Sequence, residues 1–143
     1  MVAGVDHVLV PTDGSPLSRA ALDYAMAVHP TADLTLLYVI DYVEEVHLAE
    51  ALVGFEQLHT RATSRAQDLL ADAATRADAH EGTVRTEFVF GNPSREILEY
   101  ADEHDVDLLV MGSHGRTGLS RALLGSVAQR VLQRAPVPVT IVR

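Results

Sequence analysis

Five short runs of mostly apolar residues alternate along the chain with longer segments whose apolar residues recur at helical spacing. The five runs cover residues 7–11, 34–40, 83–90, 106–111 and 136–142. Runs that are apolar on both faces are typical of strands buried in a parallel sheet. Their alternation with helices predicts an α/β fold, with an open five-stranded parallel sheet and helices on both faces. Since crossovers are right-handed, few strand orders remain, and the simplest is 3-2-1-4-5. We expect one domain over residues 1–143.

Capping residues indicate where the helices begin. Ser15 followed by Pro16 is a favourable N-cap and first helical residue. Ser94 is expected to cap the helix after the third strand, and Ser126 opens the capping-box pattern Ser-Val-Ala-Gln. The second half of segment 44–80 carries an alanine-rich stripe that predicts a helix against the sheet. Its first half is less regular and is expected to form a short helix or a mobile flap.

The basic and sulfur-containing residues exclude several kinds of chemistry. All 11 basic residues are arginine, so neither Schiff-base chemistry nor a Walker-type phosphate-loop lysine is available. The chain has no cysteine, which excludes disulfides and thiol catalysis. The net charge of −9 disfavours nucleic acid and anionic membranes as partners. With no membrane-length apolar run or signal peptide, we expect a cytoplasmic protein. The acidic, lysine-free composition also fits a salt-rich cytoplasm or a GC-rich genome.

A glycine-rich stretch, MGSHGRTGLSRALLGS, follows the fourth expected strand directly. Gly112 and Gly115 allow backbone amides to approach a bound group closely. The helix start at Ser126 offers unpaired N–H groups and a partial positive charge, which together favour an anion. In an open α/β sheet, ligands bind outside the carboxyl ends of the strands where the strand order reverses. The sequence therefore predicts a phosphate cradle, built from main chain and a hydroxyl, between the first and fourth strands.

The spacing G-x2-G-x9-G-S after the fourth of five strands resembles the ATP-binding motif of the universal stress protein family. The resemblance extends over nearly the whole chain, through HVLVPTDGSPLSRAALDYA, LTLLYVID, VFGNPSREILEYA and DLLVMGSHGRTGLSRALLGSVAQRVLQRAPVPVTIVR. It implies the Rossmann-like architecture of adenine nucleotide alpha hydrolase-like proteins.

The family motif can be carried over residue by residue. The resemblance implies that phosphates are held by Gly112, Gly115, Gly125 and Ser126, with Met111, Arg116 and Val127 beside them. It implies that Pro11, Thr12 and Asp13 hold ribose and adenine, and that the Val39 backbone contacts adenine. The implied ligand is ATP, with AMP or ADP as alternatives. Mg²⁺ or Mn²⁺ would be held mainly by phosphate oxygens, with Asp13 as the one nearby carboxylate; its ligands stay open.

Simpler roles exist for several of these residues. Asp13 is also suited to bonding the amides of its own turn, Ser126 to capping a helix, and Arg116 to solubilising its loop. His114 is a single loop histidine without a carboxylate partner in the pattern, so no catalytic role is assigned to it. The histidines show no zinc-binding spacing.

The last strand, 136–142, is an apolar edge that would aggregate if left bare. The preceding helix or loops could cover it, or it could pair with its copy in a second chain. The family resemblance favours pairing through residues 137–142, which gives a twofold homodimer.

The function that these features favour is an adenine-nucleotide-binding stress-response protein, a sensor or regulator with slow or no intrinsic hydrolysis. No general base for the γ-phosphate is evident, so a non-enzymatic role is preferred. An adenylating or ATP-hydrolysing enzyme of the same architecture is an alternative. Adenylating enzymes of this kind carry an S-G-G-x-D-S loop after the first strand, whereas this chain has PTDGSP there. A dinucleotide dehydrogenase is disfavoured, because the G-x-G-x-x-G signature of that class is absent after the first expected strand. A nucleotide-free dimeric interaction module is the remaining alternative, and the glycine motif argues against it.

Overall fold

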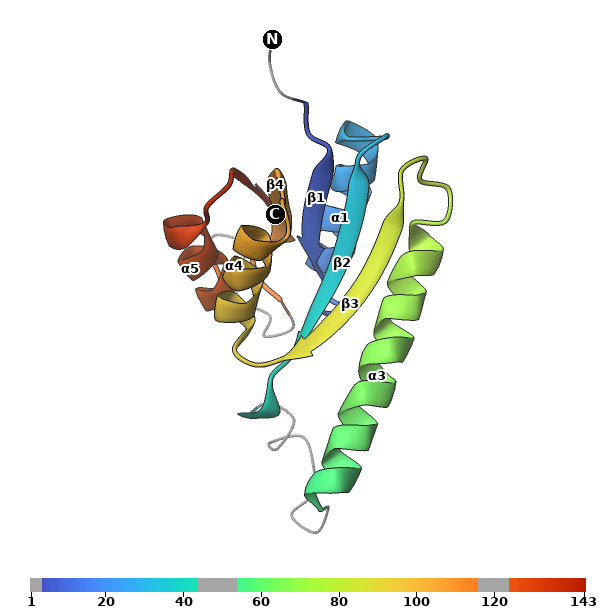
Figure 1. Ribbon diagram of the computed structural model, residues 1–143, viewed down its shortest axis with the longest axis vertical. Coiled ribbons are helices and arrows are strands. Elements are labelled where there is room, and N and C mark those ends of the chain that lie inside the picture. Colours follow the sequence, from blue (N-terminus) through green and yellow to red (C-terminus); the bar gives the residue numbers. More distant parts are fainter. Residues whose placement is uncertain (1–3, 44–53, 116–123) are drawn as a thin grey trace.

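The computed structural model describes residues 4–43, 54–115 and 124–143, which form a parallel sheet between two helical layers (Figure 1). Along the chain the elements are β1 (His7–Pro11), α1 (Pro16–Val28), β2 (Asp33–Ile40), α3 (Phe55–Arg76), β3 (Val84–Phe90), α4 (Pro93–Glu103), β4 (Leu108–Gly112), α5 (Ser126–Arg134) and β5 (Val139–Val142). The strand order is β3-β2-β1-β4-β5, and every neighbouring pair is parallel. The predicted α/β class and strand order are confirmed.

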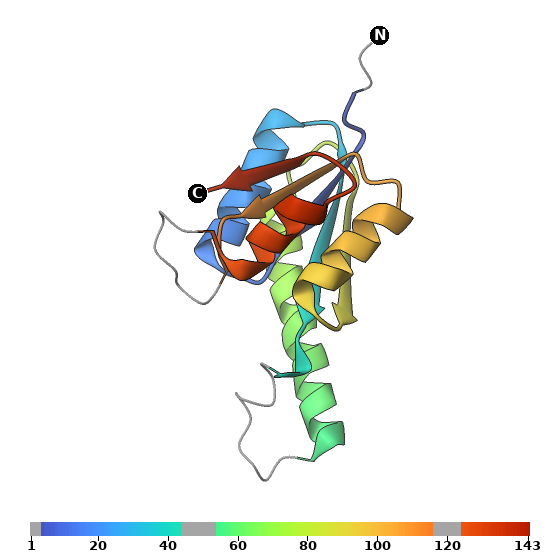
Figure 2. The same cartoon turned by 90° about the vertical axis from the view of Figure 1, so that its left-hand side faces the viewer.

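Two hydrophobic cores lie on opposite faces of the sheet. Helices α1 and α3 cover one face, and α4 and α5 cover the other (Figure 2). Val8 and Val10 of β1 point into the first core, whereas Leu9 between them is fully buried in the second. A strand whose successive side chains are buried on both faces needs the continuous apolar run seen in the sequence. Burial of each such side chain contributes roughly 1.5–3 kcal/mol to stability.

Element boundaries differ from the sequence expectations where capping or proline decides them. Asn92, and not Ser94, caps α4: its side chain accepts a hydrogen bond from the Arg95 amide, and Ser94 Oγ donates to Asn92 Oδ1. β5 begins at Val139, later than expected, because Pro138 has no N–H to donate to the ladder. The expected short helix or flap in the first half of segment 44–80 falls mostly on residues 44–53, which lie outside the described residues.

Within the described ranges, no helix combines the length and the apolar character needed to cross a membrane.

Candidate functional site

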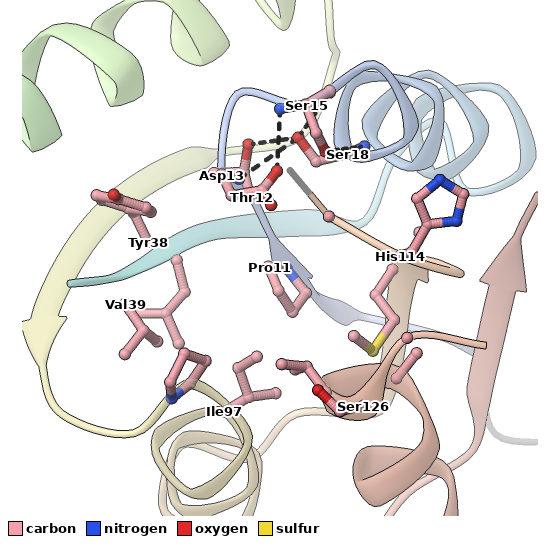
Figure 3. Close-up of a pocket in the computed structure, with 18 residues that line it drawn as sticks. Pro11, Thr12, Asp13, Ser15, Ser18, Tyr38, Val39, Ile97, His114 and Ser126 are labelled. Carbon is pink, nitrogen blue, oxygen red and sulfur yellow. Dashed lines mark hydrogen bonds between the residues drawn. The ribbon is translucent and has the colours of Figure 1, made fainter. Parts of the chain in front are cut away.

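A cavity of about 190 Å³ opens at the carboxyl ends of the central strands (Figure 3). It lies between the turn that follows β1, the loop that follows β4 and the first turn of α5. After β1 the chain continues to one face of the sheet, and after β4 it continues to the other face. The loops after these two strands therefore diverge, and the cavity lies between them. This is the switch point at which open α/β sheets bind ligands.

The structure brings the sequence-predicted site residues together around this cavity. Its lining includes Pro11, Thr12, Asp13, Val39, Met111, Gly112, Gly115, Gly125, Ser126 and Val127. These come from positions more than a hundred residues apart in the chain, which the parallel sheet places at one edge. The remaining predicted residue, Arg116, lies outside the described residues.

The turn between β1 and α1 is held by hydrogen bonds among its own residues. Ser15 is the N-cap of α1, and its Oγ accepts a hydrogen bond from the Ser18 amide at 3.2 Å. Asp13 Oδ1 accepts from the Ser15 amide at 2.9 Å. Gly14 takes φ +79°, a conformation that favours glycine. The expected start of α1, with Ser15 as cap and Pro16 as first helical residue, is confirmed.

The start of α5 lacks a side-chain cap. The N-cap is Gly125, with φ −67° and ψ 160°, and among the described residues no side-chain cap hydrogen bond is formed. The expected capping box is wrong, since Ser126 is the first helical residue and not the cap. Helix-start amides have no partner within the helix. Because these amides border the cavity, they and the helix dipole offer donors and partial positive charge to an anion.

Glycine is needed at two positions where the loops approach closely. A Cβ atom at residue 115 would overlap Asp13 Oδ2, so Gly115 lies directly against the aspartate of the opposite loop. A Cβ atom at residue 112 would lie 2.8 Å from Leu17 Cβ. The two loops meet through a glycine backbone, and a larger residue at 115 would displace the Asp13 carboxylate.

Several residues that line the cavity were not predicted from sequence. They are Ser15, Ser18, Leu37, Tyr38, Pro93, Ile97, His114 and Ala128. Pro93 and Ile97 belong to α4, which packs beside α5 and supplies an apolar wall. Helical spacing in the sequence indicates that Ile97 faces the core, but it does not indicate which end of a helix borders a cavity. No sequence pattern indicates that Ser18 lines the cavity; the sequence places it only in the first turn of a helix capped by Ser15.

The cavity wall formed by described residues carries little charge. Asp13 is its carboxylate and His114 its imidazole, with Nδ1 3.3 Å from Ser113 Oγ, and Tyr38 adds a phenol. Next to the cavity, in the first turn of α4, burial raises the pKa of the Glu96 carboxyl above 4.5, and the neighbouring Glu99 raises it further. A polyanion would therefore depend on main-chain amides for much of its binding.

An open parallel sheet of order 3-2-1-4-5 with a cavity at its switch point defines the class of Rossmann-like α/β proteins. The sequence profile described as the universal stress protein family matches residues 4–143. The chain therefore belongs to the universal stress protein family.

Individual relatives agree with this assignment. Universal stress protein MJ0531 of Methanocaldococcus jannaschii is 36% identical over 138 residues, which cover 95% of this chain and 81% of that protein. The structure of protein MJ0577 of the same organism superposes with a TM-score of 0.84 at 31% identity, covering 96% of this chain and 95% of that one. A universal stress protein in complex with cAMP superposes with a TM-score of 0.71 at 28% identity, covering 99% of each chain.

Proposed function

We propose that this protein binds an adenine nucleotide, ATP in the first place, in the cavity between β1 and β4, and acts as a stress-response sensor or regulator. The observation that carries the proposal is the uncapped start of α5 at Gly125, which borders this cavity beside Gly112 and Gly115. Main-chain amides at a helix start bind phosphate without a lysine. The chain has no lysine, so this chemistry is available to it.

The remaining walls suit the other parts of a nucleotide. Val39, Pro93 and Ile97 form an apolar surface on which a base can be buried. Thr12 and Asp13 lie across the cavity from Ser126 and supply polar side chains to a sugar (Figure 3). The relative solved with cAMP supports an adenine nucleotide as the ligand class.

A divalent cation, Mg²⁺ or Mn²⁺, would accompany a triphosphate and reduce its charge. Asp13 is the carboxylate of the described cavity wall, and its Oδ1 already accepts a hydrogen bond from the Ser15 amide. We therefore expect phosphate oxygens of the ligand, and not protein side chains, to supply most of the contacts to the ion. With no second carboxylate among the described lining residues, intrinsic hydrolysis is expected to be slow or absent.

The direct test is to denature freshly purified protein and separate the released small molecules by chromatography. Bound ATP, ADP or AMP supports the proposal, and calorimetric titration of the emptied protein with ATP then gives the affinity. An emptied protein that binds no adenine nucleotide would contradict it and favour a nucleotide-free interaction module. Release of ADP and phosphate at many turnovers would favour the alternative of an ATP-hydrolysing enzyme.

We further propose a homodimer formed through residues 137–142. β5 is an edge strand that pairs with β4 on one side only, and its residues are half-buried. Pairing with a second copy would satisfy its open edge. Sedimentation should give twice the chain mass of 15.5 kDa. A chain that lacks residues 137–143 and still sediments as a dimer would contradict the proposal.

A further inference from the structure

Ser18 is the centre of a hydrogen-bond cluster in the wall of the cavity. Its side chain and that of Thr12 are buried, with 5% and 7% of their surfaces exposed, and both line the cavity. Ser18 Oγ lies 3.1 Å from the Ser15 carbonyl oxygen, 3.3 Å from Thr12 Oγ1 and 3.4 Å from the Asp13 amide nitrogen (Figure 3). Three polar groups therefore contact one hydroxyl group.

The chemistry of these groups fixes the direction of each hydrogen bond. A serine hydroxyl has one hydrogen to donate and two lone pairs that accept. The Ser15 carbonyl can only accept and the Asp13 amide can only donate. All three contacts are hydrogen bonds only when Ser18 donates to the carbonyl and accepts from the Asp13 amide and the Thr12 hydroxyl. The single hydroxyl hydrogen of Thr12 is then directed at Ser18, and only its lone pairs remain for a ligand.

Asp13 adds to the acceptor character of this wall. An ionised carboxylate accepts hydrogen bonds and donates none. Its Oδ1 accepts from the Ser15 amide, and its Oδ2 lies against Gly115 on the other loop. The Thr12 and Asp13 side chains thus face the cavity as acceptors, whereas the Ser15 hydroxyl keeps a hydrogen of its own.

The other polar wall has the opposite character. The first turn of α5, from Ser126 onward, presents backbone amides without a side-chain cap, and these can only donate. Acceptors on one side and amide donors on the other give the cavity a fixed polarity. This arrangement favours one orientation of a ligand with donors at one end and anionic oxygens at the other.

We propose that Ser18 is a positioning residue that holds the Thr12 hydroxyl as a donor to itself, so that the β1–α1 turn selects ligands with hydroxyl donors on the sugar. This inference rests on the proposed nucleotide function and deepens it. A ribose with both the 2′ and 3′ hydroxyls supplies two donors for the two acceptors. A sugar without them leaves the Thr12 and Asp13 acceptors without a ligand partner at the cavity wall, which costs affinity.

The test compares ATP with 2′,3′-dideoxyATP by calorimetry on the full chain. The natural sequence should bind ATP about tenfold or more tightly than the dideoxy compound, as expected for hydrogen bonds that include a charged acceptor. Ser18→Ala frees the Thr12 hydroxyl hydrogen, so the ratio of the two affinities should fall by about threefold or more. Loss of stability alone would weaken both ligands equally and leave the ratio unchanged.

Ser94→Ala is the matched control. Ser94 is also 5% exposed and lies in the first turn of a helix, but it bonds Asn92 and does not line the cavity. The ratio of its affinities for ATP and 2′,3′-dideoxyATP should equal that of the natural sequence. Equal affinities for ATP and 2′,3′-dideoxyATP in the natural sequence would overturn the inference and leave the proposed function standing. An unchanged ratio in folded Ser18→Ala would overturn the role of Ser18, whereas absence of binding by either nucleotide would overturn the proposed function as well.

Discussion

Helices α1 and α5 both begin at the wall of the same cavity, but their first turns are built in opposite ways. At α1, Ser15 Oγ accepts a hydrogen bond from the Ser18 amide, and Pro16 has no backbone N–H that would need a partner. At α5, Gly125 occupies the cap position without a side-chain hydrogen bond. A side chain therefore caps the start of α1, whereas the cap residue of α5 has no side chain that could bond its amides. The cost of leaving them open is a weaker helix start, since capping side chains stabilise helices by about 1 kcal/mol.

The start of α3 shows that a glycine cap alone does not make a site. Gly54 caps α3 with φ −69° and ψ 160°, nearly the same geometry as Gly125, and it also lacks a side-chain hydrogen bond. A Cβ atom at Gly54 would meet no described residue, whereas Gly125 packs against His114 and lines the cavity. Placement at the end of β4 therefore distinguishes the two glycine caps.

The largest effect is expected from closing the contact between the two loops. Gly115→Val would drive a side chain into Asp13 and narrow the cavity. We expect ATP affinity to fall by about a hundredfold, as overpacking costs 1–3 kcal/mol. Calorimetry measures the affinity, and circular dichroism checks that the fold is retained. Unchanged affinity in the folded variant would show that the glycine loop is not part of the site.

The second prediction makes α5 begin in the way that α1 begins. Gly125→Ser keeps an allowed backbone conformation but adds a Cβ 3.2 Å from His114 Cβ and a hydroxyl that can bond the first-turn amides. We expect ATP affinity to fall by about tenfold, the loss of roughly one charge-assisted hydrogen bond.

Gly54→Ser is the matched control for that variant. It adds the same hydroxyl to a glycine cap with nothing nearby, so α3 should gain a few tenths of a kcal/mol from the new cap. Its ATP affinity should equal that of the natural sequence. Equal losses of affinity in both variants would mean that the α5 amides have no special part in binding.

Removing the cap of α1 should chiefly affect stability. Ser15→Ala deletes the hydrogen bond to the Ser18 amide but keeps the backbone amide that bonds Asp13. The free energy of unfolding should fall by about 1 kcal/mol, measured by urea denaturation. ATP affinity should change less than in Gly125→Ser. A larger loss of affinity than of stability would place the α1 start among the phosphate contacts and remove the contrast with α5.

The smallest effect concerns α4, the third helix that begins at the cavity. Burial and Glu99 raise the folded-state pKa of Glu96, so its ionised form destabilises the fold at neutral pH. Glu96→Gln should therefore stabilise the protein at pH 7 by about 0.2–0.5 kcal/mol, the size of a like-charge pair on a helix. The gain should decline as the pH falls toward the ordinary value of 4.5 and should vanish near pH 3, where Glu96 is protonated in both states. Urea denaturation at several pH values measures it, and a gain that persists at pH 3 would contradict this cause.

Much of the fold could be predicted because its signals are local. The apolar run of β1 and the Ser15-Pro16 start of α1 depend on neighbouring residues only, and both were predicted with the correct bounds. The caps of α4 and α5 could not be predicted in the same way. Ser94 and Ser126 match capping preferences, but the turn geometry gives the cap position to Asn92 and Gly125. The direction in which the chain enters each helix depends on the position of the preceding strand, and no local sequence pattern contains that position.

The sequence by itself determined the alternation of strands and helices, the absence of lysine and cysteine chemistry, and the glycine spacing, because periodicity and composition are properties of the chain. Only the tertiary structure decided which atoms face one another across the cavity. The contact of Gly115 with Asp13 joins loops that are about a hundred residues apart, and the apolar wall from Ile97 comes from a helix on one face of the sheet. The direction of the Thr12 hydroxyl depends on three contacts to Ser18 at once. Such relations arise when packing fixes several elements together, and for that reason they have no signature in any single segment.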